Sequence, residues 1–256
     1  MSPRERRRHI LERLKVEGKV EIIQLAEELQ VTPMTIRRDF DALEKQKNLI
    51  RTHGGAVLPQ ALIGERTFES KAVMAVVEKK AIAREAIEFI QAGMTILLDS
   101  GTTTLEIAKQ LKFREDVTVV TNDIKIAAEL MDSKLEVIVL GGRLQNDVGA
   151  LFGSVAEEML RSIHVDLFFL GAHAVHPSFG ITSPTFEKSS LKQRMNEAAE
   201  QIILVTDSSK FDRKSFAKVC DLDQITAMIT DDKLSELQIE AYEAQVDIIR
   251  ARQVEQ

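Results

Sequence analysis

The chain has 256 residues, 44% of them hydrophobic, which suffices for a small module and one large domain with a substantial core. It has no N-terminal apolar stretch of the secretory type and no run near the ~20 apolar residues that span a bilayer. Its single cysteine, Cys220, can form no internal disulfide and is expected in the core of a cytoplasmic protein. The net charge of −6 argues against nucleic-acid binding by the chain as a whole.

The segment after residue 20 predicts the first helix of a helix-turn-helix. Leu25, Ala26 and Leu29 form one apolar stripe at helical spacing, with Ile22 on the same side. Residues 30–31 then form a tight connection to the next helix.

The second helix is predicted to begin after Thr32, an N-cap residue, with Pro33 at the first helical position, where its missing N–H costs nothing. Ile36, Phe40 and Leu43 recur at i, i+4 and i+7, so they should pack inward.

The opposite face of this second helix carries short polar and basic side chains. Thr35, Arg38 and Lys45 lie there, with Met34 nearby and Arg37 on the flank. A helix held on its apolar side by two others can enter a major groove and present its first turns to base edges.

A short basic β-wing follows. Residues 49–53 read as a strand, and Gly54-Gly55 permits a sharp reversal at its tip. Arg51 and His53 would project beside the helix, toward phosphates or a minor groove. A three-helix module that packs only against protein would not need such converging cations. The predicted DNA-binding residues are Thr32, Met34, Thr35, Arg37, Arg38, Arg51 and His53.

Charge is divided unevenly along the chain. Residues 1–56 hold 12 Lys+Arg against 9 Asp+Glu, whereas the remainder holds 22 against 31. A mildly basic head on an acidic body is typical of a protein that binds DNA with one end. With no Trp and one Tyr, stacking on unpaired bases is disfavoured, so double-stranded DNA is the expected partner. The cluster of Arg4, Arg6, Arg7 and Arg8 is read either as a phosphate contact or as a solvated helix end.

Residues 57–71 are predicted to be a linker, and residues 1–56 and 72–256 are the expected domains on either side. Lys71–Ala92 reads as one long amphipathic helix that Gly93 ends.

The larger domain alternates short apolar runs with helical segments. Helices are expected from residue 102 to 111 and from 123 to 131. Continuous apolar strands separated by helices predict a mostly parallel α/β sandwich. The expected strands are 94–99, 117–121, 135–140, 165–170 and 201–206.

Ligands of open α/β sheets bind at the carboxyl ends of the strands. The first strand ends in Asp99-Ser100-Gly101-Thr102-Thr103-Thr104 and leads directly into a helix. Free N–H groups, the helix dipole and hydroxyls suit a phosphate or another small anion. Asp99 would repel a phosphate, so it is assigned to orienting the loop or accepting from a sugar hydroxyl. An ordinary βα turn capped by Thr103 or Thr104 is the alternative.

Other strand ends add polar partners to this effector site. Asn122 is a contact for hydroxyls, and Arg143 and Lys210 are the natural cations for a phosphate. Lys210 could instead pair with Asp207. His173 follows a fourth strand.

With these motifs in this order, the chain resembles the DeoR-type (glycerol-3-phosphate-repressor-like) bacterial transcriptional regulators along nearly its full length. The resemblance implies an effector domain similar in fold to ribose-5-phosphate isomerase that binds a phosphorylated sugar or related metabolite. It also implies repression of a carbohydrate-use operon by a homo-oligomer, a dimer or tetramer, with no enzymatic activity and no cofactor. The motifs that carry it are Thr35-Ile36-Arg37-Arg38-Asp39, Arg51-Thr52-His53-Gly54-Gly55, the turn at residues 98–104, Thr121-Asn122, Leu140-Gly141-Gly142 and Asp207-Ser208-Ser209-Lys210.

The chain departs from this family where members commonly show Gly-Ala-Asp. Here the segment reads Gly171-Ala172-His173-Ala174-Val175-His176. Carboxylates serve proton transfer in the related isomerases, so their replacement argues against residual catalysis. His173 would instead alter the choice of effector, since it can donate to a phosphate that an Asp would reject. A metal site from His173 and His176 lacks a third ligand at suggestive spacing.

Two other functions stay open beside the phosphosugar repressor. The chain could be a phosphosugar isomerase with a DNA-binding head, or an activator whose body serves only assembly.

Overall fold

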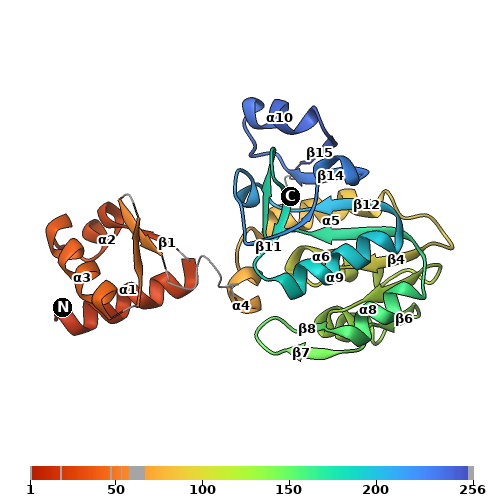
Figure 1. Ribbon diagram of the computed structural model, residues 1–256, viewed down its shortest axis with the longest axis horizontal. Coiled ribbons are helices and arrows are strands. Elements are labelled where there is room, and N and C mark those ends of the chain that lie inside the picture. The colour runs from red at the N-terminus through yellow and green to blue at the C-terminus, as the bar shows by residue number, and fades with distance from the viewer. Residues whose placement is uncertain (1, 18, 47, 53, 58–66, 253–256) are drawn as a thin grey trace. The chain divides into compact units, whose positions relative to one another are not determined.

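The computed structural model describes residues 2–17, 19–46, 48–52, 54–57 and 67–252. The chain divides into two compact units, Met1–Ser70 and Lys71–Gln256. Each unit has its own core and is described by itself (Figure 1).

The first unit is a winged helix. Its three helices enclose an apolar core that includes Ile10, Leu14 and Phe40, all fully buried. Its small antiparallel sheet has the strand order β1-β3-β2. The elements are α1 (Pro3–Glu17), β1 (Lys19–Glu21), α2 (Ile22–Glu28), α3 (Pro33–Lys45), β2 (Ile50–Thr52) and β3 (Gly55–Val57).

The predicted helix-turn-helix is present. The Thr32 hydroxyl accepts a hydrogen bond from the N–H of Thr35 (3.2 Å), so it caps α3, and Pro33 occupies the first turn. Ile36, Phe40 and Leu43 are buried as the spacing predicts.

The wing has one more strand than the sequence indicated. The reversal at Gly54 joins β2 to β3 as expected, but β1 also pairs with β3. A Cβ at Gly55 would lie 2.2 Å from the carbonyl oxygen of Val20, so only glycine allows β1 to approach.

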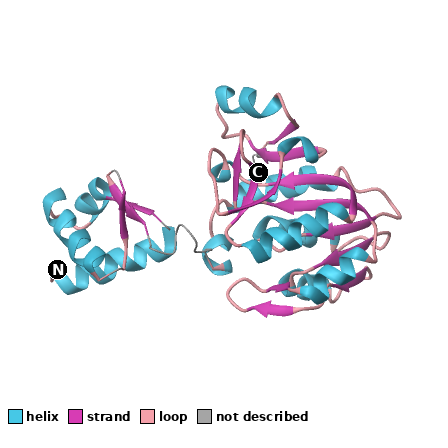
Figure 2. Cartoon of the chain, in the orientation of Figure 1, coloured by secondary structure: helices cyan, strands magenta, loops and turns pink. Residues whose placement is uncertain are grey.

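The second unit is a three-layer α/β sandwich around a seven-stranded sheet in which every strand pair is parallel (Figure 2). Its order is β15-β14-β12-β9-β4-β5-β6. The predicted sandwich is therefore confirmed. The strands are β4 (Thr95–Leu98), β5 (Thr118–Thr121), β6 (Glu136–Val139), β9 (Val165–Gly171), β12 (Ala199–Val205), β14 (Ala227–Asp231) and β15 (Asp247–Ala251).

Helices cover both faces of this sheet because alternate strand residues point to opposite sides. Ile96 and Leu98 pack into the core beneath α5, α6 and α7, and Leu97 packs into the core beneath α8, α9 and α10. The helices are α5 (Val76–Ile87), α6 (Thr102–Leu111), α7 (Ile124–Leu130), α8 (Ser154–Arg161), α9 (Phe186–Glu197) and α10 (Glu236–Glu243).

Two small antiparallel sheets stand beside the main one and were not predicted. A hairpin pairs β7 (Arg143–Gln145) with β8 (Ala150–Phe152). A three-stranded sheet has the order β10-β11-β13, from β10 (Ala174–His176), β11 (Gly180–Ser183) and β13 (Ala217–Cys220). Cys220 is buried there, and burial raises the pKa of its thiol to about 11.

The single long helix expected over residues 71–92 is wrong. A short helix, α4 (Phe68–Ala72), precedes α5, and Ala75 between them adopts the left-handed conformation (φ 50°). The buried Lys79 amine fixes this turn by donating to the carbonyl oxygens of Lys71 and Met74, each at 2.5 Å. Of the linker predicted over residues 57–71, residues 58–66 lie outside the described part of the chain.

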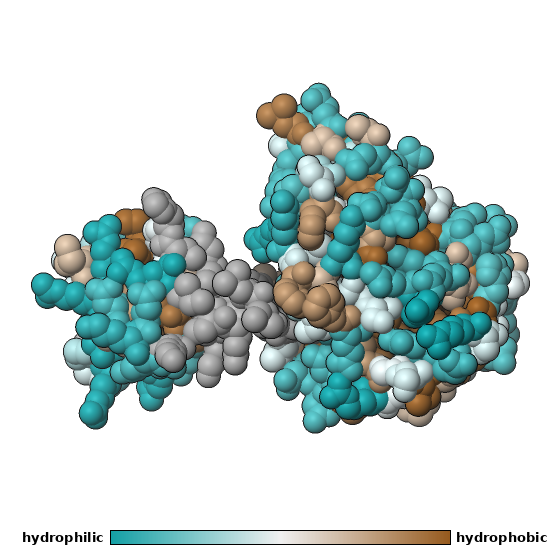
Figure 3. All heavy atoms as spheres, viewed as in Figure 1, coloured by the Kyte–Doolittle hydropathy of each residue, from teal (hydrophilic) through white to brown (hydrophobic). Residues whose placement is uncertain are grey.

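The face of the second unit seen in Figure 3 is mainly hydrophilic, with scattered apolar side chains. Among the described residues, no helix is both long enough and apolar enough to cross a membrane.

Candidate functional site

The first turns of α3 present the side chains that were predicted to contact DNA. Met34 is 54% exposed, and Arg37 and Arg38 are also exposed. Thr35 is half-buried, and its hydroxyl lies 3.0 Å from that of Thr32. The helix therefore offers two free-standing guanidinium groups beside a capped N-terminus, which suits a groove lined by phosphates and base edges.

Two of the four N-terminal arginines form ion pairs that connect α1 to α3. Arg6 and Arg7 both bind the carboxylate of Asp39 on α3, which is 2% exposed. Arg8 lies 3.8 Å from Glu12 on its own helix. The two arginines join α1 to α3 through this one carboxylate, and the phosphate contact expected of the cluster stays a prediction.

The wing strand is fastened to α3 as well. The Arg51 guanidinium pairs with Asp41, and the Arg51 N–H donates to Glu44 (3.1 Å). Arg51 thus lies beside α3 as expected, but in an exposed ion pair. His53 lies outside the described residues.

In the second unit, three neighbouring strands bring the predicted effector residues Asp99 and Asn122 to the same edge of the sheet as Gly171. Asp99, Asn122 and Gly171 follow or end β4, β5 and β9, which lie side by side in the sheet. The Ser100 N–H donates to Asn122 Oδ1 (3.0 Å), and the Gly171 N–H donates to Asp99 Oδ2 (3.0 Å). The Asp99 carboxylate thus joins the end of β4 to the end of β9, and the two roles expected for it stay predictions.

The turn from β4 into α6 leaves the helix N-terminus without a side-chain cap. Gly101 is the N-cap residue, and neither Thr103 nor Thr104 caps the helix. The Thr104 hydroxyl instead donates to the carbonyl oxygens of Asp99 (2.7 Å) and Gly101 (3.0 Å). The alternative of an ordinary capped turn is therefore wrong. Thr102 is buried and Thr103 half-buried in the same turn.

Lys192, on α9, was not among the predicted site residues. Its amine contacts Asp99 Oδ2 and donates to the Gly171 carbonyl oxygen (2.7 Å). Lys188, one turn earlier, is buried with its amine 5.5 Å from the centre of the Phe152 ring, and burial lowers the pKa of that amine to about 7. The Lys192 amine thus lies at the carboxyl edge of the sheet, and the Lys188 amine lies against Phe152 of the β7–β8 hairpin.

The remaining predicted effector residues are more dispersed. Arg143 lies on β7, outside the main sheet, and its exposed side chain pairs with Glu187 (2.5 Å). Its assignment to the effector stays a prediction. Lys210 ends a short 3-10 helix (Ser208–Lys210) after β12, and its charge acts on the buried Lys79. His173 is half-buried between β9 and β10.

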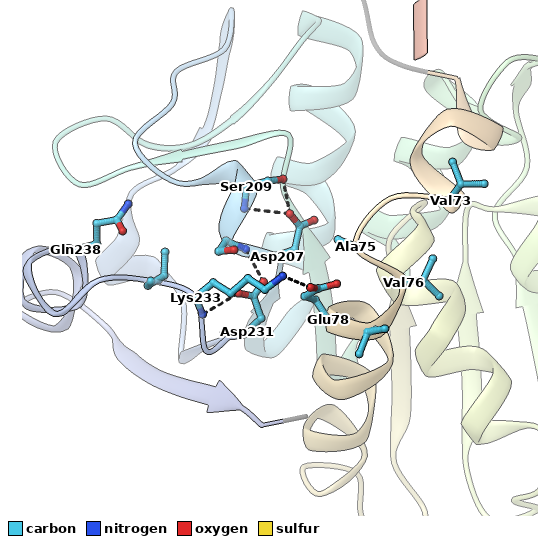
Figure 4. A pocket seen from close by; sticks show the side chains of 12 residues that line it. Val73, Ala75, Val76, Glu78, Asp207, Ser209, Asp231, Lys233 and Gln238 are labelled. Atoms are coloured by element: carbon cyan, nitrogen blue, oxygen red, sulfur yellow. Dashed lines mark hydrogen bonds and ion pairs between the residues drawn. The ribbon is translucent and has the colours of Figure 1, made fainter. Parts of the chain in front are cut away.

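A pocket of about 500 Å³ lies at the carboxyl ends of β12 and β14 (Figure 4). Glu78 and Lys233 pair across it, and the N–H groups of Ser208 (2.8 Å) and Lys233 (3.0 Å) both donate to Asp231. It adjoins the loop that carries Lys210. Its lining residues are Val73, Ala75, Val76, Val77, Glu78, Asp207, Ser208, Ser209, Asp231, Lys233, Leu234 and Gln238.

The histidine pair has no metal-site geometry in the part of the chain that the structure describes. No group of three His, Cys, Asp or Glu side chains is arranged to hold a metal ion there. His176 Nδ1 instead accepts the N–H of Ser178 (3.1 Å).

Comparison with known proteins gives two family matches. Residues 6–61 match the DeoR-like helix-turn-helix domain, and residues 74–232 match the DeoR C terminal sensor domain. Among curated relatives, the HTH-type transcriptional regulator GlpR of Haloferax volcanii is 36% identical over 91% of this chain and 92% of its own. The lactose phosphotransferase system repressor of Lactococcus lactis is 36% identical over 98% of this chain and 100% of its own.

Among solved structures, ribose 5-phosphate isomerase A from Methanocaldococcus jannaschii aligns with 53% of this chain and 54% of its own. The sequence identity is 18% and the TM-score 0.40. The matched curated relatives are named as transcriptional regulators, which confirms the expectation of a regulator rather than an enzyme.

Proposed function

The chain belongs to the DeoR family of helix-turn-helix transcriptional regulators, and from this premise we propose that it represses a carbohydrate-use operon under the control of a phosphorylated sugar. The sugar phosphate binds in the sensor domain, and a homo-oligomer places paired winged heads on operator half-sites. The name of the Lactococcus relative, which refers to a sugar phosphotransferase system, supports this class of operon.

On the DNA side, the proposal is supported by the exposed first turns of α3. Arg37 and Arg38 stand free in solvent while Asp39, next in sequence, is buried against α1. The helix therefore has one face for the core and one face for base edges or nearby phosphates.

On the sensor side, the uncapped turn at residues 101–104 is the observation that carries the proposal. Its first N–H groups have no side-chain acceptor, and Asn122 and Lys192 lie beside it. Such a turn suits a phosphate group, and Asn122 and the threonine hydroxyls suit the oxygen atoms of a sugar. We assign Lys210 and His173, which follow β12 and β9 in the sequence, to the same ligand. Ligand binding then favours the state with lower operator affinity, by a coupling of typically ~1–3 kcal/mol.

A fluorescence-anisotropy titration tests the proposal. Full-length protein is titrated onto duplex DNA from upstream of its own operon, with and without each of a panel of sugar phosphates. We expect tight, salt-dependent binding that one sugar phosphate weakens. Tight binding that no sugar phosphate changes would contradict the ligand class, and absence of binding would contradict the DNA assignment.

Lys210→Ala separates the two halves of the proposal. We expect loss of the response to the sugar phosphate, because the variant lacks a cation that would bind the phosphate group. Operator affinity should stay close to that of the unaltered protein, because Lys210 belongs to the second unit and not to the winged helix. Lys80→Ala, an exposed lysine on α5, is the matched control and should respond normally. Full induction of Lys210→Ala would show that this residue does not bind the ligand.

A further inference from the structure

We propose that the Asp99–Lys192 pair sets the charge of the ligand that the sensor domain accepts, because Lys192 neutralises Asp99 and so admits a phosphate dianion to the turn at residues 99–104. The inference rests on the proposed function, since it concerns the same site.

The pair is buried and tightly connected. The side chain of Asp99 is 3% exposed and that of Lys192 is 12% exposed. Asp99 Oδ2 accepts from the Lys192 amine and from the Gly171 N–H (3.0 Å), and the same amine donates to the Gly171 carbonyl oxygen (2.7 Å). A Cβ at Gly171 would lie 3.0 Å from Asp99 Oδ2, so the approach of carboxylate and backbone depends on this glycine.

The main chain of Asp99 is bound to the first turn of α6, while its carboxylate is held by Lys192 and the Gly171 N–H. The Thr104 hydroxyl donates to the carbonyl oxygens of Asp99 and Gly101, and Ser100 is held by Asn122. An anion at the N-terminus of α6 therefore lies within a few residues of a buried negative charge. At the effective dielectric constant of a partly buried site, one uncompensated charge changes the affinity for a dianion by at least about tenfold.

A second buried amine supports a role in ligand binding beyond bracing the fold. The Lys192 amine alone is enough to pair with the Asp99 carboxylate. Lys188 lies one turn earlier on α9, and the charge of Lys192 acts on it, so the two amines are within electrostatic reach of each other. Below pH 7, where Lys188 is protonated, the two amines of α9 outnumber the Asp99 carboxylate, and the local charge favours an anion.

The test compares the unaltered protein with Asp99→Asn, Lys192→Gln and the double variant, using inorganic phosphate as the probe at pH 7.5. Dissociation constants come from the phosphate dependence of the melting temperature. We expect Asp99→Asn to bind phosphate at least about tenfold more tightly and Lys192→Gln at least about tenfold more weakly. The double variant, which restores neutrality, should return to within about threefold of the unaltered protein.

Arg194→Gln is the control for loss of one positive charge from the same helix. Arg194 pairs with Glu197 on the surface (2.5 Å), so its removal should leave phosphate affinity unchanged. If Lys192→Gln does not fold, Asp99→Asn still tests the idea, because it leaves no buried carboxylate unpaired, and Lys192→Arg should bind phosphate normally.

Two outcomes would overturn the inference: a double variant as weak as Lys192→Gln, or an Asp99→Asn protein that binds phosphate no more tightly than the unaltered one. Absence of phosphate binding in all four proteins would overturn it too. If the expected order of affinities holds but no sugar phosphate changes operator binding, the proposed control of the operon is wrong. The inference that the Asp99–Lys192 pair sets the charge of the ligand is then still supported.

Discussion

Lys188 occupies a place where a charged amine is unfavourable. It is 7% exposed, and burial is the main reason that its pKa falls from 10.5 to about 7, with the nearby charge of Lys192 as the second cause. The Phe152 ring beneath the amine offsets only part of this cost. Since the unfolded chain holds the proton more strongly than the folded one, the protein loses stability when both states are protonated.

Lys188→Met should therefore make the protein more stable at pH 7 and below, by about 1–3 kcal/mol. The advantage should shrink as the pH rises from 7 to 10.5 and vanish above that, because the amine is then neutral in both states. The measurement is the free energy of unfolding of both proteins in urea between pH 6 and pH 10. An advantage that does not change with pH would show that it comes from packing and not from the charge.

At the residue scale, the candidate site could be predicted where a residue follows a strand. Asp99 and Asn122 were found because parallel strands end at one edge of the sheet. The same rule did not indicate that the chain turns into the β7–β8 hairpin, where Arg143 pairs with Glu187. Lys192 could not be found, because it lies within a helix and meets Asp99 across 93 positions of sequence.

At the element scale, the start of α3 depends on one hydroxyl. Thr32 accepts the N–H of Thr35, and the first turn that follows carries Met34 and Arg37. The predicted DNA-contacting side chains therefore stand on a turn whose order depends on the cap.

Thr32→Ala should lower the stability of the winged helix by about 1 kcal/mol and weaken operator binding, since a frayed first turn must be ordered again on DNA. Thr32→Ser keeps the hydroxyl and should restore both. Thermal unfolding followed by circular dichroism gives the first quantity, and anisotropy titration the second. If Thr32→Ser binds DNA as weakly as Thr32→Ala, the methyl group and not the cap is what matters.

The elements that could be predicted are those with a strong local pattern. β4, β5, β6, β9 and β12 each contain a run of two to four consecutive apolar residues, and each was expected within a few residues. β14 and β15 were both missed because their apolar runs are short, residues 227–229 and 248–249, and polar residues follow directly. The break between α4 and α5 has no proline or glycine to mark it. It depends on the Lys79 amine, which binds two carbonyl groups of the preceding turn.

At the scale of the whole molecule, DNA binding depends on how charge is divided between the winged-helix head and the rest of the chain. The head carries a net charge of +3 and the remainder −9, within a total of −6. The release of counterions from DNA on binding therefore depends on the few cations of the head. The acidic second unit adds no long-range attraction to the DNA.

Arg38→Ala should weaken operator binding by about 1–3 kcal/mol, and it should also reduce the slope of log K against log salt by about one if its partner is a phosphate. Lys134→Ala removes the same charge from an exposed position of the second unit, where Lys134 pairs with Glu115. This control should change neither the affinity nor the slope. Titrations at several salt concentrations distinguish the cases, and equal losses in both variants would mean that net charge alone governs binding.

The buried Cys220 can report how often the second unit opens. It is the chain's only thiol, it is 4% exposed, and with its pKa near 11 almost none of it is thiolate at neutral pH. An alkylating reagent can react only with molecules whose second unit has opened around β13. The rate of labelling of the unaltered protein therefore reports how often the unit opens. A metabolite that binds the closed form makes opening rarer, so slower labelling in its presence would reveal a ligand without any DNA present.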